Sequence, residues 1–160
     1  MNYNKHVVGT TSELLAKVHF LNKGYIVSKP INDFNRYDLI IDNGEKIERV
    51  QVKTAYWDNN KKRYLVSCVV THIRGDENRY NKKYEEGSFD LLACVHPESN
   101  SIYVIPFEEV EGRRSLTLYP DGKPKAVNSR YRDFEDYKEK LTMLGANPYP
   151  YHSVNRANSS

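Results

Sequence analysis

The chain has 160 residues, 39% of them hydrophobic and 28% charged, and this balance favours one globular domain over a disordered or fibrous chain. Apolar runs of only a few residues exclude a membrane-spanning helix, and the first residues lack the apolar segment of a secretory signal. Cys68 and Cys94 lie in apolar runs without metal-ligand spacing. We therefore expect buried, reduced thiols and a cytoplasmic protein.

The net charge of +3 does not by itself predict a nucleic-acid partner, but the basic residues are clustered. Residues 112–132 contain six Lys and Arg residues against Asp121 alone, and residues 59–67 and 74–84 mix Lys and Arg with Asn and Tyr. These residue types suit contacts to phosphates and bases. Any one stretch could be a solvated loop, whereas three of them together favour a polyanionic partner.

The first half of the chain predicts a helix followed by strands. Residues 10–23 place apolar side chains at helical spacing, with Thr10 as the expected N-cap and Gly24 as the expected stop. Residues 25–30 predict a short strand. Residues 37–54 then predict two strands around Asn43-Gly44, a dipeptide typical of hairpin turns.

The second half predicts further strands and a closing helix. We expect a strand at 63–70, a polar loop at 71–88, a second hairpin made by 89–95 and 102–107, and a helix at 133–144. This order predicts a single α/β domain over residues 1–146, with a mixed β-sheet and flanking helices. Residues 147–160 are expected to form a loosely ordered tail.

The alternation of side chains along the two strands of the first hairpin brings three polar residues to one face. If the turn centres on Asn43-Gly44, Asp38 lies opposite residue 49, and if it centres on Gly44-Glu45, Asp38 lies opposite Gln51. In both registers Asp38, Gln51 and Lys53 share a face, while the apolar residues of both strands share the other.

Such a cluster could form a metal site with a basic neighbour. The oxygens of Asp38 and Gln51 suit Mg²⁺, the main-chain oxygen of Val52 could add a ligand, and Lys53 could hold a water or offset phosphate charge. The alternative is an exposed polar face on which Asp38 forms a plain ion pair with Arg49 or Lys53. The hairpin alone leaves both explanations open.

The order of these residues resembles that of the PD-(D/E)XK nuclease superfamily: Glu13 in a helix, Asp38 in a strand, and Gln51-Val52-Lys53 in the next strand. Within this superfamily the sequence looks most like the homing endonucleases encoded in bacterial group I introns, which use Gln before x-Lys. The resemblance covers about residues 5–120. Tyr37 stands where the family name has Pro. On spacing alone, Glu13 could instead form a capping box with Thr10.

The resemblance implies a restriction-endonuclease-like fold and a Mg²⁺-dependent, sequence-specific DNA endonuclease, with Mn²⁺ able to substitute. Asp38, Gln51 and the main-chain oxygen of Val52 would hold the metal, Glu13 would support it directly or through water, and Lys53 would orient the attacking water. The partner would be double-stranded DNA. The enzyme would be at least a dimer, and the homing relatives suggest a tetramer.

Two alternatives share this fold, a Holliday-junction resolvase and a restriction endonuclease, and a third is a DNA-binding module without catalysis. For the DNA-binding surface we predict basic and polar residues of the three clustered stretches, with residues 78–81 reading base edges if loop 71–88 enters the major groove. The predicted contacts are Lys61, Lys62, Arg63, Arg74, Asn78, Arg79, Tyr80, Asn81, Lys82, Lys83, Arg113 and Arg114.

Overall fold

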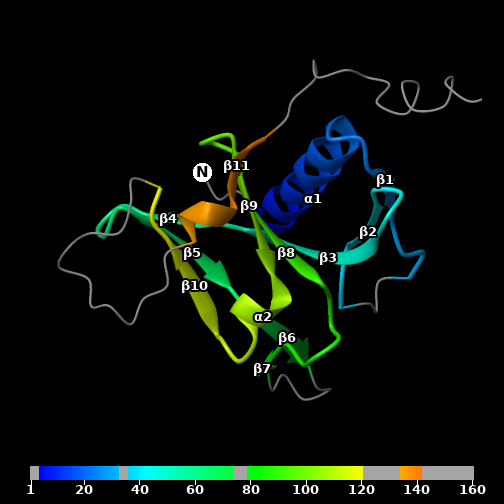
Figure 1. Cartoon of the computed structure of the whole chain (residues 1–160). Coiled ribbons are helices and arrows are strands. Elements are labelled where there is room, and N and C mark those ends of the chain that lie inside the picture. Colours follow the sequence, from blue (N-terminus) through cyan, green and yellow to red (C-terminus); the bar gives the residue numbers. More distant parts are fainter. Residues whose placement is uncertain (1–3, 33–35, 74–78, 121–133, 142–160) are drawn as a thin grey trace, which may run out of the picture.

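The computed structural model of the chain describes residues 4–32, 36–73, 79–120 and 134–141. Its centre is a six-stranded sheet in the order β1-β2-β3-β8-β9-β11, with helix α1 along one face (Figure 1). Its strands are β1 Ile26–Ser28, β2 Leu39–Asp42, β3 Ile47–Thr54, β8 Leu91–His96, β9 Ser101–Pro106 and β11 Lys138–Lys140. Only β3 and β8 pair in parallel, so the sheet is mixed and the predicted α/β fold is confirmed.

Helix α1 runs from Lys5 to Asn22 and begins earlier than the sequence predicted. The side chain of Asn4 accepts a hydrogen bond from the His6 amide (3.1 Å), so Asn4 is the N-cap and Thr10 lies inside the helix. The prediction of Thr10 as N-cap is wrong because an earlier Asn already supplies the cap. The predicted stop is confirmed, since Gly24 follows the helix with a φ of +88°.

The first hairpin adopts one of its two expected registers. Leu39 pairs with Val50 and Asp42 with Ile47, which leaves a four-residue turn centred on Gly44-Glu45. The side chain of Asn43 accepts hydrogen bonds from the amides of Glu45 and Lys46 and holds this turn closed. The apolar face of the hairpin is buried against α1, as the alternation predicted.

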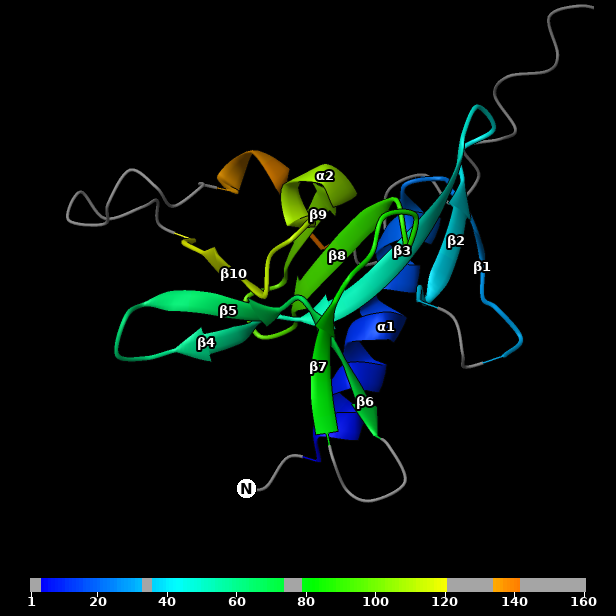
Figure 2. The same cartoon turned by 90° about the horizontal axis from the view of Figure 1, so that it is seen from below.

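Residues 63–70 form two strands of different sheets, and the prediction of one strand is wrong. Strand β5, Arg63–Ser67, lies between β4, Tyr56–Asp58, and β10, Ser115–Leu118, in a three-stranded sheet. Beyond Cys68 the chain enters β6, Val69–Ile73, which pairs only with β7, Arg79–Lys83. Residues 71–73 and 79–83 of the predicted loop therefore belong to a two-stranded β-ribbon. Figure 2 shows this ribbon and the β4–β5 hairpin projecting in different directions from the end of β3.

The predicted helix at 133–144 is wrong over the residues that the structure describes. Residues Glu135–Tyr137 form one turn of 3₁₀-helix, and β11 then pairs with β9. Glu139 in β11 accepts hydrogen bonds from His19 (3.1 Å) and Lys23 (2.6 Å) of α1. These contacts, together with the open edge of β9, outweigh the local helical pattern. The sequence also gave no sign of the short helix α2, Phe107–Val110.

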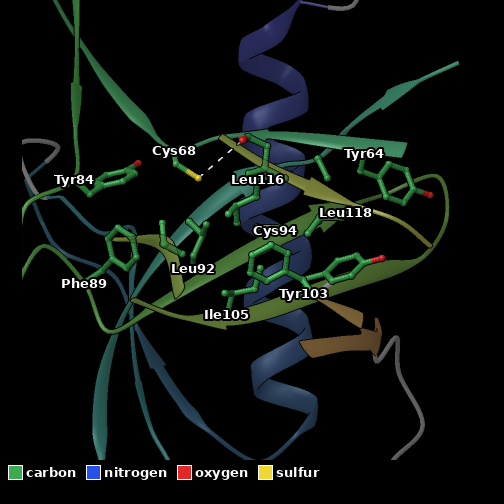
Figure 3. Close-up of a cluster of buried hydrophobic side chains, with 14 residues drawn as sticks. Tyr64, Cys68, Tyr84, Phe89, Leu92, Cys94, Tyr103, Ile105, Leu116 and Leu118 are labelled. Carbon is green, nitrogen blue, oxygen red and sulfur yellow. Dashed lines mark hydrogen bonds between the residues drawn. The ribbon is translucent and has the colours of Figure 1, made fainter. Parts of the chain in front are cut away.

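Two apolar cores lie on the two faces of the central sheet. One is formed with α1, around Phe20 and Leu39. The other lies toward β5 and β10 and contains Tyr103, Cys68 and Cys94 (Figure 3). Both cysteines are buried free thiols, as predicted, and burial raises the pKa of Cys68 to about 11. None of the described helices is long and apolar enough to span a bilayer.

Candidate active site

Asp38 stands at the point where β2 stops pairing with β3. Its amide donates to the Val50 carbonyl (2.8 Å), and its carboxylate accepts hydrogen bonds from the Val52 amide (2.7 Å) and the Gln51 side chain (2.6 Å). The Val52 amide points past the last paired residue of β2 and would otherwise lack a partner there. Asp38 therefore closes the end of the hairpin and brings its carboxylate to Gln51.

Gln51 connects two oxygen atoms on this face. Its amide nitrogen donates both to Asp38 and to the main-chain oxygen of Val52 (3.1 Å). The carboxylate, the Val52 carbonyl and the Gln51 amide thus meet in one small group. All three carry the hard oxygen donors that Mg²⁺ prefers, so the residues present fit a divalent cation. Their metal-binding roles stay predictions.

Lys53 lies on the same strand face, and its surroundings hold it in place. Its ammonium nitrogen is 5.8 Å from the centre of the Tyr84 ring, within reach of a cation–π contact. Burial lowers the pKa of Lys53, and the nearby carboxylate of Asp38 opposes that change. Tyr84 directly follows β7, so the base of the β-ribbon packs against the lysine. Sequence reasoning missed Tyr84 because nothing local links it to residue 53.

Burial also acts on Asp38. It raises the pKa of the Asp38 carboxyl, and the negative charge of Glu13 raises it further, while the Val52 hydrogen bond and the charges of Lys53 and Lys29 lower it. The site thus holds two carboxylates that repel each other and two ammonium groups that offset them. A divalent cation would relieve this repulsion.

Glu13 reaches this neighbourhood from α1. The capping box with Thr10 is excluded, because the helix starts at Lys5 and Thr10 lies inside it. Glu13 is half-buried and forms an ion pair with Lys29 (3.7 Å). The adjacent Ser12 hydroxyl lies 2.7 Å from the Thr54 hydroxyl and ties α1 to the end of β3. This bond places Glu13 and Lys53, the two neighbours of the bonded pair, at the same end of the sheet.

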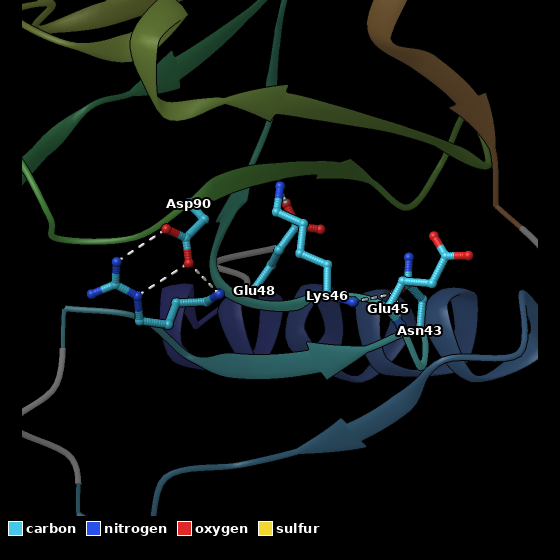
Figure 4. A network of polar contacts seen from close by, with 6 residues as sticks. Asn43, Glu45, Lys46, Glu48 and Asp90 are labelled. Carbon is cyan, nitrogen blue, oxygen red and sulfur yellow. Dashed lines mark hydrogen bonds and ion pairs between the residues drawn. The ribbon is translucent and has the colours of Figure 1, made fainter.

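Arg49 does not belong to the cluster. Its guanidinium binds the Asp90 carboxylate with contacts of 3.1 and 3.0 Å and also donates to the Gly87 carbonyl. Figure 4 shows Asp90, which directly precedes β8, and the hydrogen bonds that its carboxylate accepts. The arginine holds the pKa of Asp90 below its usual range. The alternative in which Asp38 pairs with Arg49 is therefore wrong.

The predicted DNA contacts are spread over the two projecting arms. Lys61 and Lys62 are exposed at the β4–β5 turn, and Lys82 and Lys83 are exposed at the end of β7. The main chain of Arg79, Tyr80 and Asn81 forms the rest of β7, whereas Arg74 and Asn78 lie outside the described residues.

Three of the five predicted arginines are less available than the lysines, or lie apart from them. Arg63 is half-buried and pairs with Asp58 (3.3 Å). Arg113 donates to the Glu109 carbonyl (2.7 Å) and lies over the Phe134 ring. Arg114 is exposed beside β10, where its carbonyl accepts from the Cys68 amide.

Across the described ranges, no three His, Cys, Asp or Glu side chains form a group able to hold a metal ion. The cluster at Asp38 is of another kind, because it combines one carboxylate with neutral amide and carbonyl oxygens. Glu13 would be the second acid near it.

Comparisons with known proteins agree on the type of fold. A family model described as PD-(D/E)XK endonuclease matches residues 3–140. The bacterial homing endonuclease I-Ssp6803I has a solved structure that superposes with a TM-score of 0.71, covering 85% of this chain and 89% of that one. Its sequence is 22% identical, so this likeness shows the fold alone.

Two curated proteins are similar in sequence. Protein 5.3 of Escherichia phage T7 is 30% identical over 120 residues, which cover 71% of this chain and 90% of that protein. Restriction of telomere capping protein 1 of Candida dubliniensis is 31% identical over 115 residues, but this chain spans only 10% of its length.

Proposed function

The chain belongs to the PD-(D/E)XK endonuclease family and is a deoxyribonuclease, and we propose that it is a Mg²⁺-dependent homing endonuclease that cuts both strands of a specific DNA target. The observation that carries the proposal is the meeting of Asp38, Gln51 and the Val52 carbonyl beside Lys53. The similarity in fold to a bacterial homing endonuclease supports the homing role.

The metal would be held by the Asp38 carboxylate, the Val52 main-chain oxygen and the Gln51 side-chain oxygen, with Glu13 as a direct or water-mediated support. When bound, Mg²⁺, or Mn²⁺ in its place, offsets the negative charge that develops on the phosphate during hydrolysis. Gln51 now directs its nitrogen at the two oxygens, so its amide must turn about its last bond to present oxygen to a cation.

Lys53 would act on the attacking water and on the phosphate. Burial lowers the pKa of its ammonium, which brings the group closer to the pH at which it can exchange a proton. In its charged form it donates hydrogen bonds from a fixed position near Asp38 and Tyr84 and stabilises an oxyanion there.

The β6–β7 ribbon is the element best placed to read DNA sequence. A two-stranded β-ribbon fits the major groove, and Arg and Asn side chains suit guanine and adenine edges. The ribbon ends at Tyr84, next to Lys53, so a ribbon seated in the groove brings the lysine to the adjacent backbone. The exposed lysines of the β4–β5 turn would contact phosphates farther along the duplex.

One chain provides one such cluster, and one cluster cuts one strand. A double-strand break therefore requires at least two copies, which a symmetric homodimer or a tetramer would supply.

The test uses purified protein, Mg²⁺ or Mn²⁺, and a DNA library that contains candidate insertion sites. We expect Asp38→Ala and Lys53→Ala to abolish cleavage while DNA affinity in EDTA changes by less than about threefold. Full cleavage by either variant would remove these residues from the mechanism. Cleavage of four-way junctions without sequence preference would favour a resolvase, and binding without any nicking would favour a non-catalytic module.

Gln51→Glu tests the metal ligand specifically. A third carboxylate beside Asp38 and Glu13 should lower the Mg²⁺ concentration needed for half-maximal cleavage, whereas Gln51→Ala should raise it. An unchanged metal requirement in both variants would show that Gln51 is not a ligand.

A further inference from the structure

A cavity of about 590 Å³ opens at the N-terminal end of α1, between the helix, β4 and the β8–β9 turn. Its walls include Val8 and Thr11 of α1, Thr54 at the end of β3, and Tyr56 and Trp57 of β4. The volume lies within the range of small-molecule binding sites in proteins. Nothing in the proposed cleavage mechanism uses this space.

Two aromatic side chains on the cavity wall are exposed. Tyr56 is 50% and Trp57 is 38% accessible to solvent, which is unusual for rings that could pack inside. The Trp57 ring packs against Tyr64 in a tilted arrangement with 4.8 Å between centroids, and Tyr64 packs in the same way against the His96 ring at 4.2 Å. The contact with Tyr64 holds the indole in place. A fixed, exposed ring of this kind is a surface on which another flat ring can stack.

The polar groups of the cavity favour a neutral ligand with amino donors. Among the described residues that line it there is no Lys or Arg, and the one fully charged group is the Glu98 carboxylate. The His96 ring nitrogen Nδ1 is already bonded to the Ser99 hydroxyl (2.7 Å) and amide (3.0 Å). The Asn59 amide offers a further donor and acceptor at the rim. A phosphate would be repelled here, whereas an exocyclic amino group could donate to Glu98.

The cavity lies beside the proposed path of the DNA. Thr54 lines it from the α1 face of β3, whereas the side chain of the preceding Lys53 lies on the other face, over the Tyr84 ring. The exposed Lys61 and Lys62 form the turn of the same hairpin that carries the two aromatic rings, so a DNA strand whose phosphates contact these lysines would lie close to the cavity.

We propose that this cavity binds one unstacked nucleobase with an exocyclic amino group, from a DNA strand whose phosphates contact the β4–β5 turn. The inference rests on the proposed function in one respect, that DNA is bound along this turn. Stacking on Trp57 and Tyr56 offsets the cost of unstacking the base, and Glu98 selects cytosine, adenine or guanine over thymine.

Trp57 is the only tryptophan in the chain, so its fluorescence reports directly on stacking. The full chain is titrated in EDTA with three single-stranded oligonucleotides. Each carries twelve thymidines around a central position, which is thymine, cytosine or an abasic site. We expect saturable quenching with the cytosine oligonucleotide at about tenfold lower concentration than with the other two.

Variants distinguish recognition of the base from binding of the DNA backbone. Glu98→Gln should bring the preference for cytosine to within about twofold, and Tyr56→Ala should weaken cytosine binding about fivefold or more. Lys61→Ala is the matched control on the same hairpin, and it should weaken all three oligonucleotides equally.

Equal quenching by the abasic and cytosine oligonucleotides, or an unchanged preference in Glu98→Gln, would overturn the proposal. Because the titration needs neither metal nor cleavage, its outcome is independent of the catalytic assignment. Asp38→Ala should abolish cleavage and leave the quenching intact. A preparation that quenches with cytosine but never cuts would support the cavity and contradict the nuclease mechanism.

Discussion

The side-chain amide of Gln51 makes contacts that a carboxylate could not make in its place. Its nitrogen donates to Asp38 and to the Val52 carbonyl, and both are acceptors. A glutamate here would face two oxygens without a donor, beside a carboxyl whose pKa burial and Glu13 already raise. Glutamine thus stabilises the hairpin end without metal, and this gives a physical reason for a neutral residue at this position.

Lys53 should show a conflict between activity and stability. A buried ammonium with a lowered pKa destabilises the folded state below that pKa, and the penalty disappears as the pH rises toward the unfolded value of 10.5. We expect Lys53→Met to raise the melting temperature by a few degrees at pH 7, with a gain that shrinks toward pH 10, and to abolish cleavage.

Differential scanning calorimetry at several pH values checks this prediction, with Lys83→Met as an exposed control that should not change the melting temperature. If the Lys53→Met protein is less stable than the natural chain at pH 7, the contacts of the ammonium with Asp38 and Tyr84 stabilise the fold by more than its burial destabilises it.

At the scale of elements, α1 is fixed to the site by the bond between Ser12 and Thr54. Ser12→Ala removes this bond at a buried contact, so we expect a loss of about 1 kcal/mol in stability. Because the next residue is Glu13, we also expect a fall in kcat of about tenfold or less, with little change in DNA affinity.

Thr10→Ala is the matched control, since Thr10 is an exposed residue of the same helix and does not line the cavity. It should leave kcat unchanged. The Ser12→Ala and Thr54→Val changes should also be non-additive in stability, and full additivity would show that the two hydroxyls do not act together.

The end of β7 carries two neighbouring lysines with different surroundings. Lys82 pairs with Glu85, which also binds Arg36 (2.8 Å), and these cations lower the pKa of Glu85 to about 2. Lys83 has no ion pair within the part of the chain that the structure describes. Lys83→Ala should therefore weaken DNA binding more than Lys82→Ala, because the Lys82 charge is already partly neutralised.

The dependence of DNA affinity on salt concentration measures how many phosphate contacts each variant loses. Loss of one phosphate contact lowers the slope of log K against log salt by about 0.9, and we expect this change for Lys83→Ala alone. Equal slopes for the two variants would show that Glu85 releases Lys82 when DNA binds.

The predictable elements were those set by local chemistry. The Asn43-Gly44 dipeptide and the buried alternation around it predicted the hairpin, and both possible registers put Asp38 and Gln51 on one face; the structure selects the register centred on Gly44-Glu45. Strand β11 was not predictable, because Phe134 and Leu141 fit helical spacing and only the open edge of β9 selects a strand. The Ser12–Thr54 contact joins positions 42 residues apart, and no signal in one sequence pairs them.

At the scale of the whole molecule, cutting both strands requires two complete copies. If the natural chain is mixed with excess Asp38→Ala protein, mixed oligomers should hold one working site each. On a plasmid target we expect linear product to fall and nicked circles to accumulate as the variant fraction rises.

Gel analysis of the products after subunit exchange checks this expectation, and sedimentation of the natural chain gives the oligomer size. Linear product that falls only in proportion to the natural chain, without nicked circles, would show that a single copy cuts both strands.

Two of the joints between the three sheets are single buried residues: Ala55 lies between β3 and β4, and Cys68 between β5 and β6. Both have small side chains; Ala55 lies two positions after Lys53, and the charge of Lys53 acts on the Cys68 thiol. An insertion there would displace the arms and the lysine together. The outer turn at residues 59–62 has no such constraint, so the strength of DNA binding can evolve or be engineered by changing that turn while the chemical centre stays the same.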